Sequence, residues 1–90
     1  MRDTQNPALM RAFAAELKAR RAREQISQDE LAHRCQVNRT FLAKLEVATT
    51  QPSFSVLLKI ANGLNADLTE LVAATMQRYA KEVRAAVRKP

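Results

Sequence analysis

The chain has 90 residues, a length that allows one small domain with a modest core. Aromatic residues make up only 4% of it, and one Gly with three Pro leaves little turn chemistry for hairpins, so the composition favours an all-α fold. The net charge of +6 favours an anionic partner, and the single Cys excludes an internal disulfide. No apolar run approaches the ~20 residues of a membrane span, and we expect a cytoplasmic protein.

The first expected element is a helix over residues 7–24. Residues 1–6 are polar and predict a flexible N-terminal arm, Asn6 can cap the helix, and Pro7 suits its first position. Apolar residues at helical spacing mark its inner face: Leu9, Phe13 and Leu17. The outer side, which we expect to be mainly solvated, carries three basic residues: Lys18, Arg20 and Arg23.

Residues 27–46 predict two short helices joined by a tight turn. Ser27, followed three residues later by Glu30, forms a capping box that begins the first of them. The apolar pattern breaks at residues 35–37, and Asn38 can then cap the second helix. The second helix turns three apolar residues inward: Phe41, Leu42 and Leu45. Its outward face is polar and partly basic, as the DNA major groove requires: Arg39, Thr40, Ala43 and Lys44.

The next helix follows a loop over residues 47–52, which lack periodicity and end in Gln-Pro. Ser53 caps this helix and Asn65 ends it, while Gly63 is a weak point of roughly 1 kcal/mol against Ala. The expected apolar face consists of Phe54, Leu57, Leu58, Ala61 and Leu64.

The last helix begins at Asp67, which forms a second capping box with Glu70, and nothing stops it before Pro90. It carries an apolar stripe: Val72, Met76, Tyr79, Val83 and Val87. A helix that projects beyond a small domain must bury such a stripe against something. Residues 73–90 are therefore predicted to be a C-terminal helical extension that forms a dimer interface. The stripe could instead hold a different protein or fold back on the first helix.

Nothing in the sequence indicates catalysis or a bound cofactor. His33 has no second ligand at metal spacing, and Cys35 occupies a position where a small, buried and inert residue is expected. We find no acid/base pair, nucleophile triad or phosphate-binding glycine loop, so we expect no enzyme, no cofactor and no metal.

Taken together, the pattern resembles the lambda-repressor and Cro family of bacterial and phage regulators, also called the XRE family, over about residues 9–72. The residues that carry the resemblance are Leu17 with Arg21, Ser27-Gln28-x-Glu30-Leu31-Ala32, Val37-Asn38-Arg39, Leu42, Leu45-Glu46, Pro52-Ser53, Leu57-Leu58, Ala61, Leu64 and Asp67-Leu68-x-Glu70-Leu71. The resemblance implies a five-helix DNA-binding domain over residues 7–72. It also implies binding of a pseudo-palindromic operator in double-stranded DNA, usually as a homodimer.

The resemblance also implies roles for individual residues. Those that contact DNA are Gln28, Asn38, Arg39, Thr40, Ala43, Lys44 and Thr49, with Gln28 binding phosphate and supporting a base-reading side chain. Arg21 and Glu46 match a structural pair that ties the first helix to the end of the recognition helix. The chain departs from the family at Gln36, where the turn usually has Gly, at a cost of about 1 kcal/mol. It also lacks the usual Gly and basic residue in 47–50, so that phosphate binding there relies on hydroxyls and backbone amides.

These observations favour a transcriptional regulator, for example a repressor, that binds an inverted repeat as a homodimer. A first alternative is an antitoxin that binds its own operator and holds a toxin partner through the C-terminal helix. A second is an adaptor that has lost DNA binding, because residues 25–50 carry three basic and three acidic side chains and are therefore neutral.

Overall fold

The computed structural model describes residues 5–88, and these form five helices and no strand. The helices are α1 (Pro7–Glu24), α2 (Gln28–Cys35), α3 (Arg39–Glu46), α4 (Phe54–Gly63) and α5 (Leu68–Arg88). The predicted all-α, five-helix fold is confirmed. Most of the expected N-terminal arm, residues 1–4, lies outside the described part of the chain, as do residues 89–90. No helix within residues 5–88 has the length and apolar character needed to cross a membrane.

Side-chain caps explain where the helices begin. The five capping residues are Asn6, Ser27, Asn38, Ser53 and Asp67, as the sequence predicts. Each accepts a hydrogen bond from a first-turn backbone amide, at donor–acceptor distances between 2.7 and 3.1 Å. These bonds satisfy amides that have no partner within the helix, so the local sequence sets each starting point.

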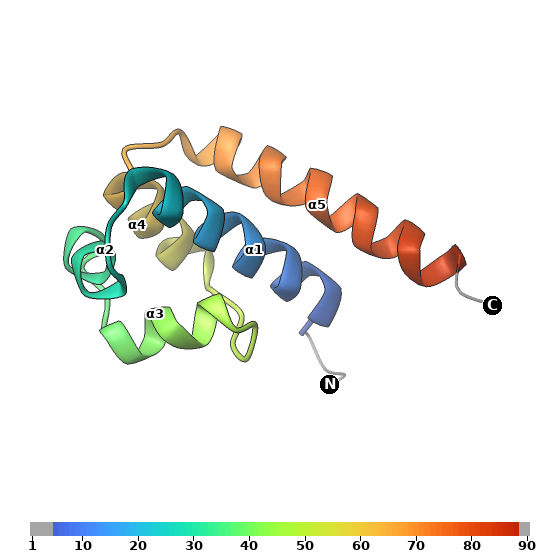
Figure 1. Cartoon of the computed structure of the whole chain (residues 1–90), viewed down its shortest axis with the longest axis horizontal. Coiled ribbons are helices and arrows are strands. Elements are labelled where there is room, and N and C mark those ends of the chain that lie inside the picture. Colours follow the sequence, from blue (N-terminus) through green and yellow to red (C-terminus); the bar gives the residue numbers. More distant parts are fainter. Residues whose placement is uncertain (1–4, 89–90) are drawn as a thin grey trace.

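The core lies where all five helices meet. Each helix contributes at least one fully buried large aliphatic side chain to it, among them Leu17, Leu31, Leu42, Ile60 and Leu71. Burying such a side chain contributes about 1.5–3 kcal/mol, so these five positions hold the helices in one arrangement. Figure 1 shows α3 on one side of α1 and α5 on the other.

The expected apolar face of α4 is wrong at two positions. Phe54 is 77% exposed and Leu58 is 49% exposed, whereas Ile60 is fully buried. The reason is that α4 is apolar around most of its circumference, so its periodicity does not select one face. Packing against α2 and α5 selects the face that carries Ile60 and Ala61.

Gly63, near the end of α4, lies where this helix approaches α2 most closely. A Cβ atom at this position would lie 2.4 Å from Sγ of Cys35 and 2.9 Å from its backbone N and Cα. The glycine therefore costs helix propensity but permits the close contact between the two helices.

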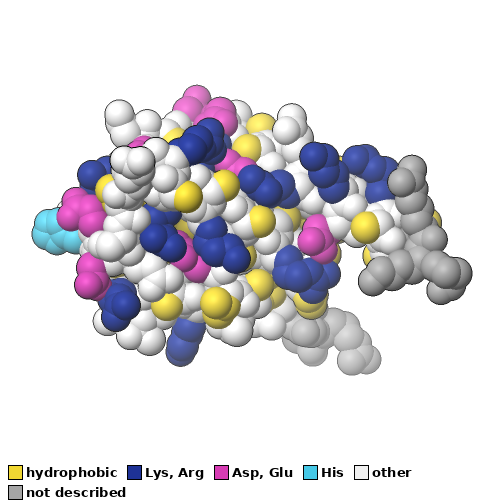
Figure 2. Space-filling view, in the orientation of Figure 1, with side chains coloured by type: hydrophobic (Ala, Val, Ile, Leu, Met, Phe, Trp, Pro, Cys, Tyr) yellow, Lys and Arg dark blue, Asp and Glu magenta, His cyan; other side chains and the backbone are white. Residues whose placement is uncertain are grey.

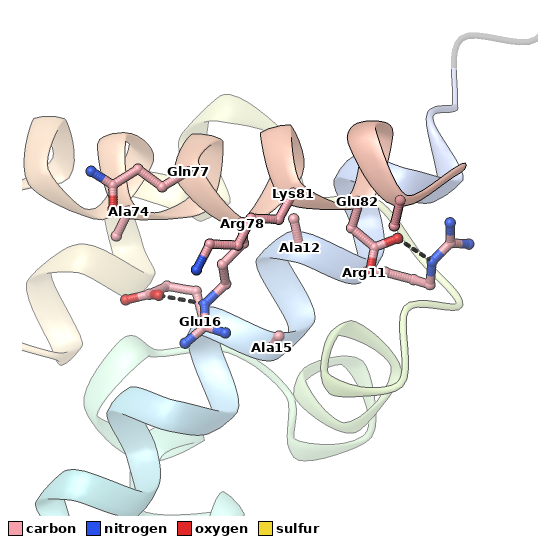
Figure 3. Close-up of a pocket in the computed structure, with 10 residues that line it drawn as sticks. Arg11, Ala12, Ala15, Glu16, Ala74, Gln77, Arg78, Lys81 and Glu82 are labelled. Atoms are coloured by element: carbon pink, nitrogen blue, oxygen red, sulfur yellow. Dashed lines mark hydrogen bonds and ion pairs between the residues drawn. The ribbon is translucent and has the colours of Figure 1, made fainter. Parts of the chain in front are cut away.

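α5 lies along α1, and ion pairs join the two helices (Figure 1, Figure 3). Glu16 is buried, and its carboxylate accepts hydrogen bonds from Arg20, one turn along α1, and from Arg78 of α5 at 2.8 Å. Farther along, Nε of Arg11 donates to Glu82 at 3.1 Å. The expectation of a solvated Arg20 is wrong, because its side chain is largely buried and also bonds Glu70 at 2.6 Å.

Candidate nucleic-acid interface

The α2–α3 pair has the geometry of two helices joined by one left-handed turn residue. Gln36 has a φ of 58°, and the next amide, that of Val37, donates to the carbonyl of Ala32 at 3.0 Å. The turn therefore adopts the backbone that the family usually gives to Gly. Both helices bury side chains in the common core: Leu31, Ala32 and Cys35 of α2 and Leu42 and Leu45 of α3.

The outer face of α3 is accessible to solvent at most of its positions. Arg39, Thr40 and Lys44 are exposed and Ala43 is half-buried, while Phe41 is half-buried on the inner side. Asn38 uses its side-chain oxygen to bond the amides of Thr40 and Phe41, which leaves its amide nitrogen as a possible donor to a ligand. This end of α3 thus presents three polar side chains around one small residue.

Arg39, the first residue of α3, forms an ion pair with a residue of α2 that the sequence pattern did not single out. Its Nε lies 2.9 Å from Oδ1 of Asp29, and the two side chains are 64% and 76% exposed. The neighbouring acid, Glu30, does not close the capping box with its carboxylate but pairs with Arg34 at 3.0 Å. Two acids in the same helix turn therefore have different partners, and only Asp29 contacts the start of α3.

Arg21 and Glu46 form a two-bond ion pair between α1 and the end of α3. Nε and Nη2 of Arg21 donate to the two carboxylate oxygens at 2.7 and 3.0 Å, and Nη1 donates to the carbonyl of Ile26. Glu46 is only 2% exposed. Burial alone would raise the pKa of Glu46, but the hydrogen bonds from Arg21 and Gln28 outweigh it and hold the pKa below its ordinary value.

Gln28, the first residue of α2, is tied into this pair. Its side-chain amide nitrogen donates to Glu46 at 3.0 Å. An amide nitrogen carries two hydrogens, so Gln28 retains one donor for a phosphate oxygen. The next residue, Asp29, is the one that contacts Arg39 at the start of α3.

The loop after α3 uses much of its hydrogen-bonding capacity internally. The amide and the hydroxyl of Thr49 both lie within bonding distance of the carbonyl of Lys44, at 3.0 and 3.2 Å. Ala48 has a φ of 61°, in the left-handed region where the family usually has Gly. A phosphate contact by Thr49 would therefore need its hydroxyl to leave Lys44.

Cys35 and His33 are the remaining candidates for functional residues. Cys35 is buried, and burial raises the pKa of its thiol to about 11, which disfavours the reactive thiolate. His33 is exposed, and residues 5–88 contain no group of three His, Cys, Asp or Glu side chains that could hold a metal ion.

Basic side chains are distributed rather than gathered. Figure 2 shows Lys and Arg spread over one face of the molecule with Asp and Glu between them. Positive charge near α2 and α3 is balanced by Asp29, Glu30 and Glu46, in line with the neutral count over residues 25–50. The α2–α3 pair therefore does not present a uniform positive field.

Comparison with solved structures shows a shared fold. Two crystal structures of the clp gene regulator ClgR from Corynebacterium glutamicum are similar to this chain. One is 25% identical with a TM-score of 0.72 and covers 80% of this chain and 94% of its own. The other is 23% identical with a TM-score of 0.79 and covers 91% and 87%. The wild-type restriction-modification controller protein C.Esp1396I is 18% identical, with a TM-score of 0.72 over 78% of this chain and 90% of its own.

Comparison of the sequence itself gives the family. No curated protein sequence matches the chain. The family model described as Helix-turn-helix (HTH_3) matches residues 17–71, which is more than half of the chain and includes α2, the turn and α3. The chain therefore belongs to the XRE-like helix-turn-helix family of DNA-binding transcriptional regulators.

Proposed function

We propose that this regulator binds a pseudo-palindromic operator as a homodimer, with α3 of each protomer in the major groove. The observation that carries the proposal is the exposed polar end of α3, where Arg39, Thr40 and Lys44 surround the small Ala43. An α-helix fits the major groove, and the residues at its N-terminal end reach the base edges first.

The proposal gives these side chains different tasks. Arg39 reads a guanine through two hydrogen bonds, whereas Thr40 and Lys44 contact base or phosphate oxygens. Ala43 permits close approach or touches a thymine methyl group. Gln28 and Asn38 bind phosphate through their free amide hydrogens, and Thr49 does so through its hydroxyl, which positions α3 without reading sequence.

The homodimer is supported by the apolar stripe on α5. The side of α5 that packs on α1 carries Thr75 and Arg78, and the stripe lies beside it. Met76 and Val83 remain 44% and 39% exposed, and the stripe continues to Val87 near the described end of the helix. α5 therefore folds back on α1 and leaves these stripe residues only partly covered.

A second copy of the chain is the occupant that we propose for this surface. A two-fold contact is self-complementary, so each protomer buries the stripe of the other. It also places two recognition helices about one turn of DNA apart, roughly 34 Å, as an inverted repeat requires. Beside Met76 the surface is hollowed between α1, α5 and the start of α4, and this hollow is mainly apolar.

The test is to place charges on the stripe. Met76→Asp with Val83→Asp should give a folded monomer with little operator affinity, measured by sedimentation and by DNA binding at fixed salt. Tyr79 is not suitable, because its hydroxyl lies 3.4 Å from the side chain of Asn6 at the start of α1. The matched control is Ala73→Asp with Gln77→Asp, which adds the same charge at exposed α5 positions outside the stripe.

The outcomes separate the homodimer from its alternative. A stripe variant that remains dimeric would place the interface elsewhere. A wild type that is monomeric at micromolar concentration would favour the antitoxin alternative, in which the same stripe holds a different protein, and co-purification from the native host would then identify that partner.

A further inference from the structure

Asp29 and Arg39 each lie in the first turn of their helix in the α2–α3 pair. The carboxylate Oδ1 of Asp29 lies 2.9 Å from Nε of Arg39. Gln28, which precedes Asp29, donates its side-chain amide to Glu46.

Asp29 contacts Nε of Arg39, so the two terminal nitrogens of the guanidinium remain available to a ligand. A guanidinium has five N–H donors in one plane, of which Nε carries one and the two terminal nitrogens carry four. The ion pair with Asp29 is made at Nε and limits where the guanidinium can lie, while both terminal nitrogens can still donate. A guanine presents O6 and N7 side by side in the major groove, which is the acceptor pair that two such donors fit.

We propose that Asp29 is a positioning residue that sets the base preference of Arg39 for guanine. The inference rests on the function proposed above, because it concerns how α3 reads DNA. Both side chains are more than half exposed, so the pair contributes little to the stability of the free protein. Its effect arises on binding, where an oriented side chain loses less conformational freedom than a free one.

The carboxylate of Asp29 is expected to weaken DNA binding. A negative charge beside the DNA-reading helix repels phosphates and lowers affinity for every sequence. If Asp29 positions Arg39, the same side chain also raises discrimination against a wrong base. Removal of Asp29 should therefore change affinity and discrimination in opposite directions, which loss of a purely structural residue would not do.

The experiment measures discrimination rather than affinity alone. An operator is first selected from random DNA with the wild type, and the guanine read by Arg39 is located as the position where Arg39→Ala loses preference. Competition binding at fixed salt then compares this operator with one changed at that base pair. The variants are Asp29→Ala and Glu30→Ala. The second is the matched control, because Glu30 carries the same charge in the same helix turn but pairs with Arg34.

We expect Asp29→Ala to bind bulk DNA more tightly and to lose about three- to tenfold of its discrimination at that base pair, since Arg39 itself remains. Glu30→Ala should also bind bulk DNA more tightly and keep its discrimination. In the Arg39→Ala background, Asp29→Ala should have no further effect on discrimination.

Three results would overturn the inference. Full discrimination in Asp29→Ala would show that the pair has no role in reading. An equal loss in Glu30→Ala would show an effect of charge alone, and a further loss in the Arg39→Ala background would mean that Asp29 contacts a base itself. If the wild type selects no sequence, both the proposed function and the inference fail. If the wild type does select a sequence, a negative result with Asp29→Ala refutes only the inference about Asp29.

Discussion

Removal of the Arg21 side chain tests the ion pair that fixes the recognition helix. Glu46 is 2% exposed in the wild type, and in Arg21→Ala its carboxylate keeps only the bond from Gln28. Breaking a buried ion pair from one side costs about 3–5 kcal/mol. Since Arg21 is 25% exposed and Gln28 remains in place, we expect the lower end, a loss of about 3 kcal/mol in the free energy of unfolding at pH 7.

The pH dependence of this loss follows from the pKa of Glu46. In the wild type that pKa is lowered, so the pair contributes stability above the unfolded pKa and loses it as the pH falls through the folded pKa. Without Arg21, burial should raise the folded pKa of Glu46 above its unfolded value, so the variant is penalised at neutral pH and relieved in acid. The difference between the two proteins should therefore shrink from pH 7 to pH 4.

The assay is urea unfolding followed by far-ultraviolet circular dichroism at one fixed protomer concentration, because dimerisation makes stability concentration-dependent. The double variant Arg21→Ala with Glu46→Ala should lose less than the sum of the single losses. A loss below about 1 kcal/mol, strict additivity, or a difference that is constant from pH 7 to pH 4 would refute the reasoning.

Three further substitutions probe other parts of the fold, each by the same unfolding measurement. Ala48→Gly should stabilise the protein by about 0.5–1 kcal/mol, because the left-handed φ of 61° strains Ala; no gain would mean that the backbone relaxes without cost. Gly63→Ala should destabilise it by about 1–3 kcal/mol despite the better helix propensity of Ala, because the new Cβ would lie 2.9 Å from the backbone of Cys35, and a gain in stability would contradict this. Glu16→Ala should cost about 2–3 kcal/mol by leaving the basic side chains around it without their shared carboxylate, including Arg78, and a neutral effect would show that α5 does not depend on the pair.

The helix boundaries could be predicted from the sequence because they depend on neighbouring residues. Ser27, Asn38 and Ser53 cap the helices that follow them, whatever the rest of the chain does. The buried face of α4 could not be predicted in the same way. Phe54 and Leu58 are as apolar as the side chains that are buried, and the choice between them depends on where α2 and α5 lie.

The residues of the candidate site and one of its ion pairs could be predicted from the sequence, whereas its other contacts could not. The outward positions of α3 follow from helical periodicity, and the Arg21–Glu46 contact follows from a family resemblance. The pairs of Glu16 with Arg78 and of Asp29 with Arg39 connect different helices, so no local spacing signals them. Gly63 shows the same limit, because its sequence context reveals a propensity cost while its close approach to Cys35 exists only in the folded chain.

The central claim is that two copies of this chain read an inverted repeat through α3. Selection of bound sequences from random DNA by the full chain, at one fixed salt concentration, tests it most directly. The account predicts two half-sites related by two-fold symmetry, with centres about one helical turn or roughly 34 Å apart. Arg39→Ala should remove the preference at one guanine of each half-site. Selection of no sequence, or of a single half-site without symmetry, would contradict the account.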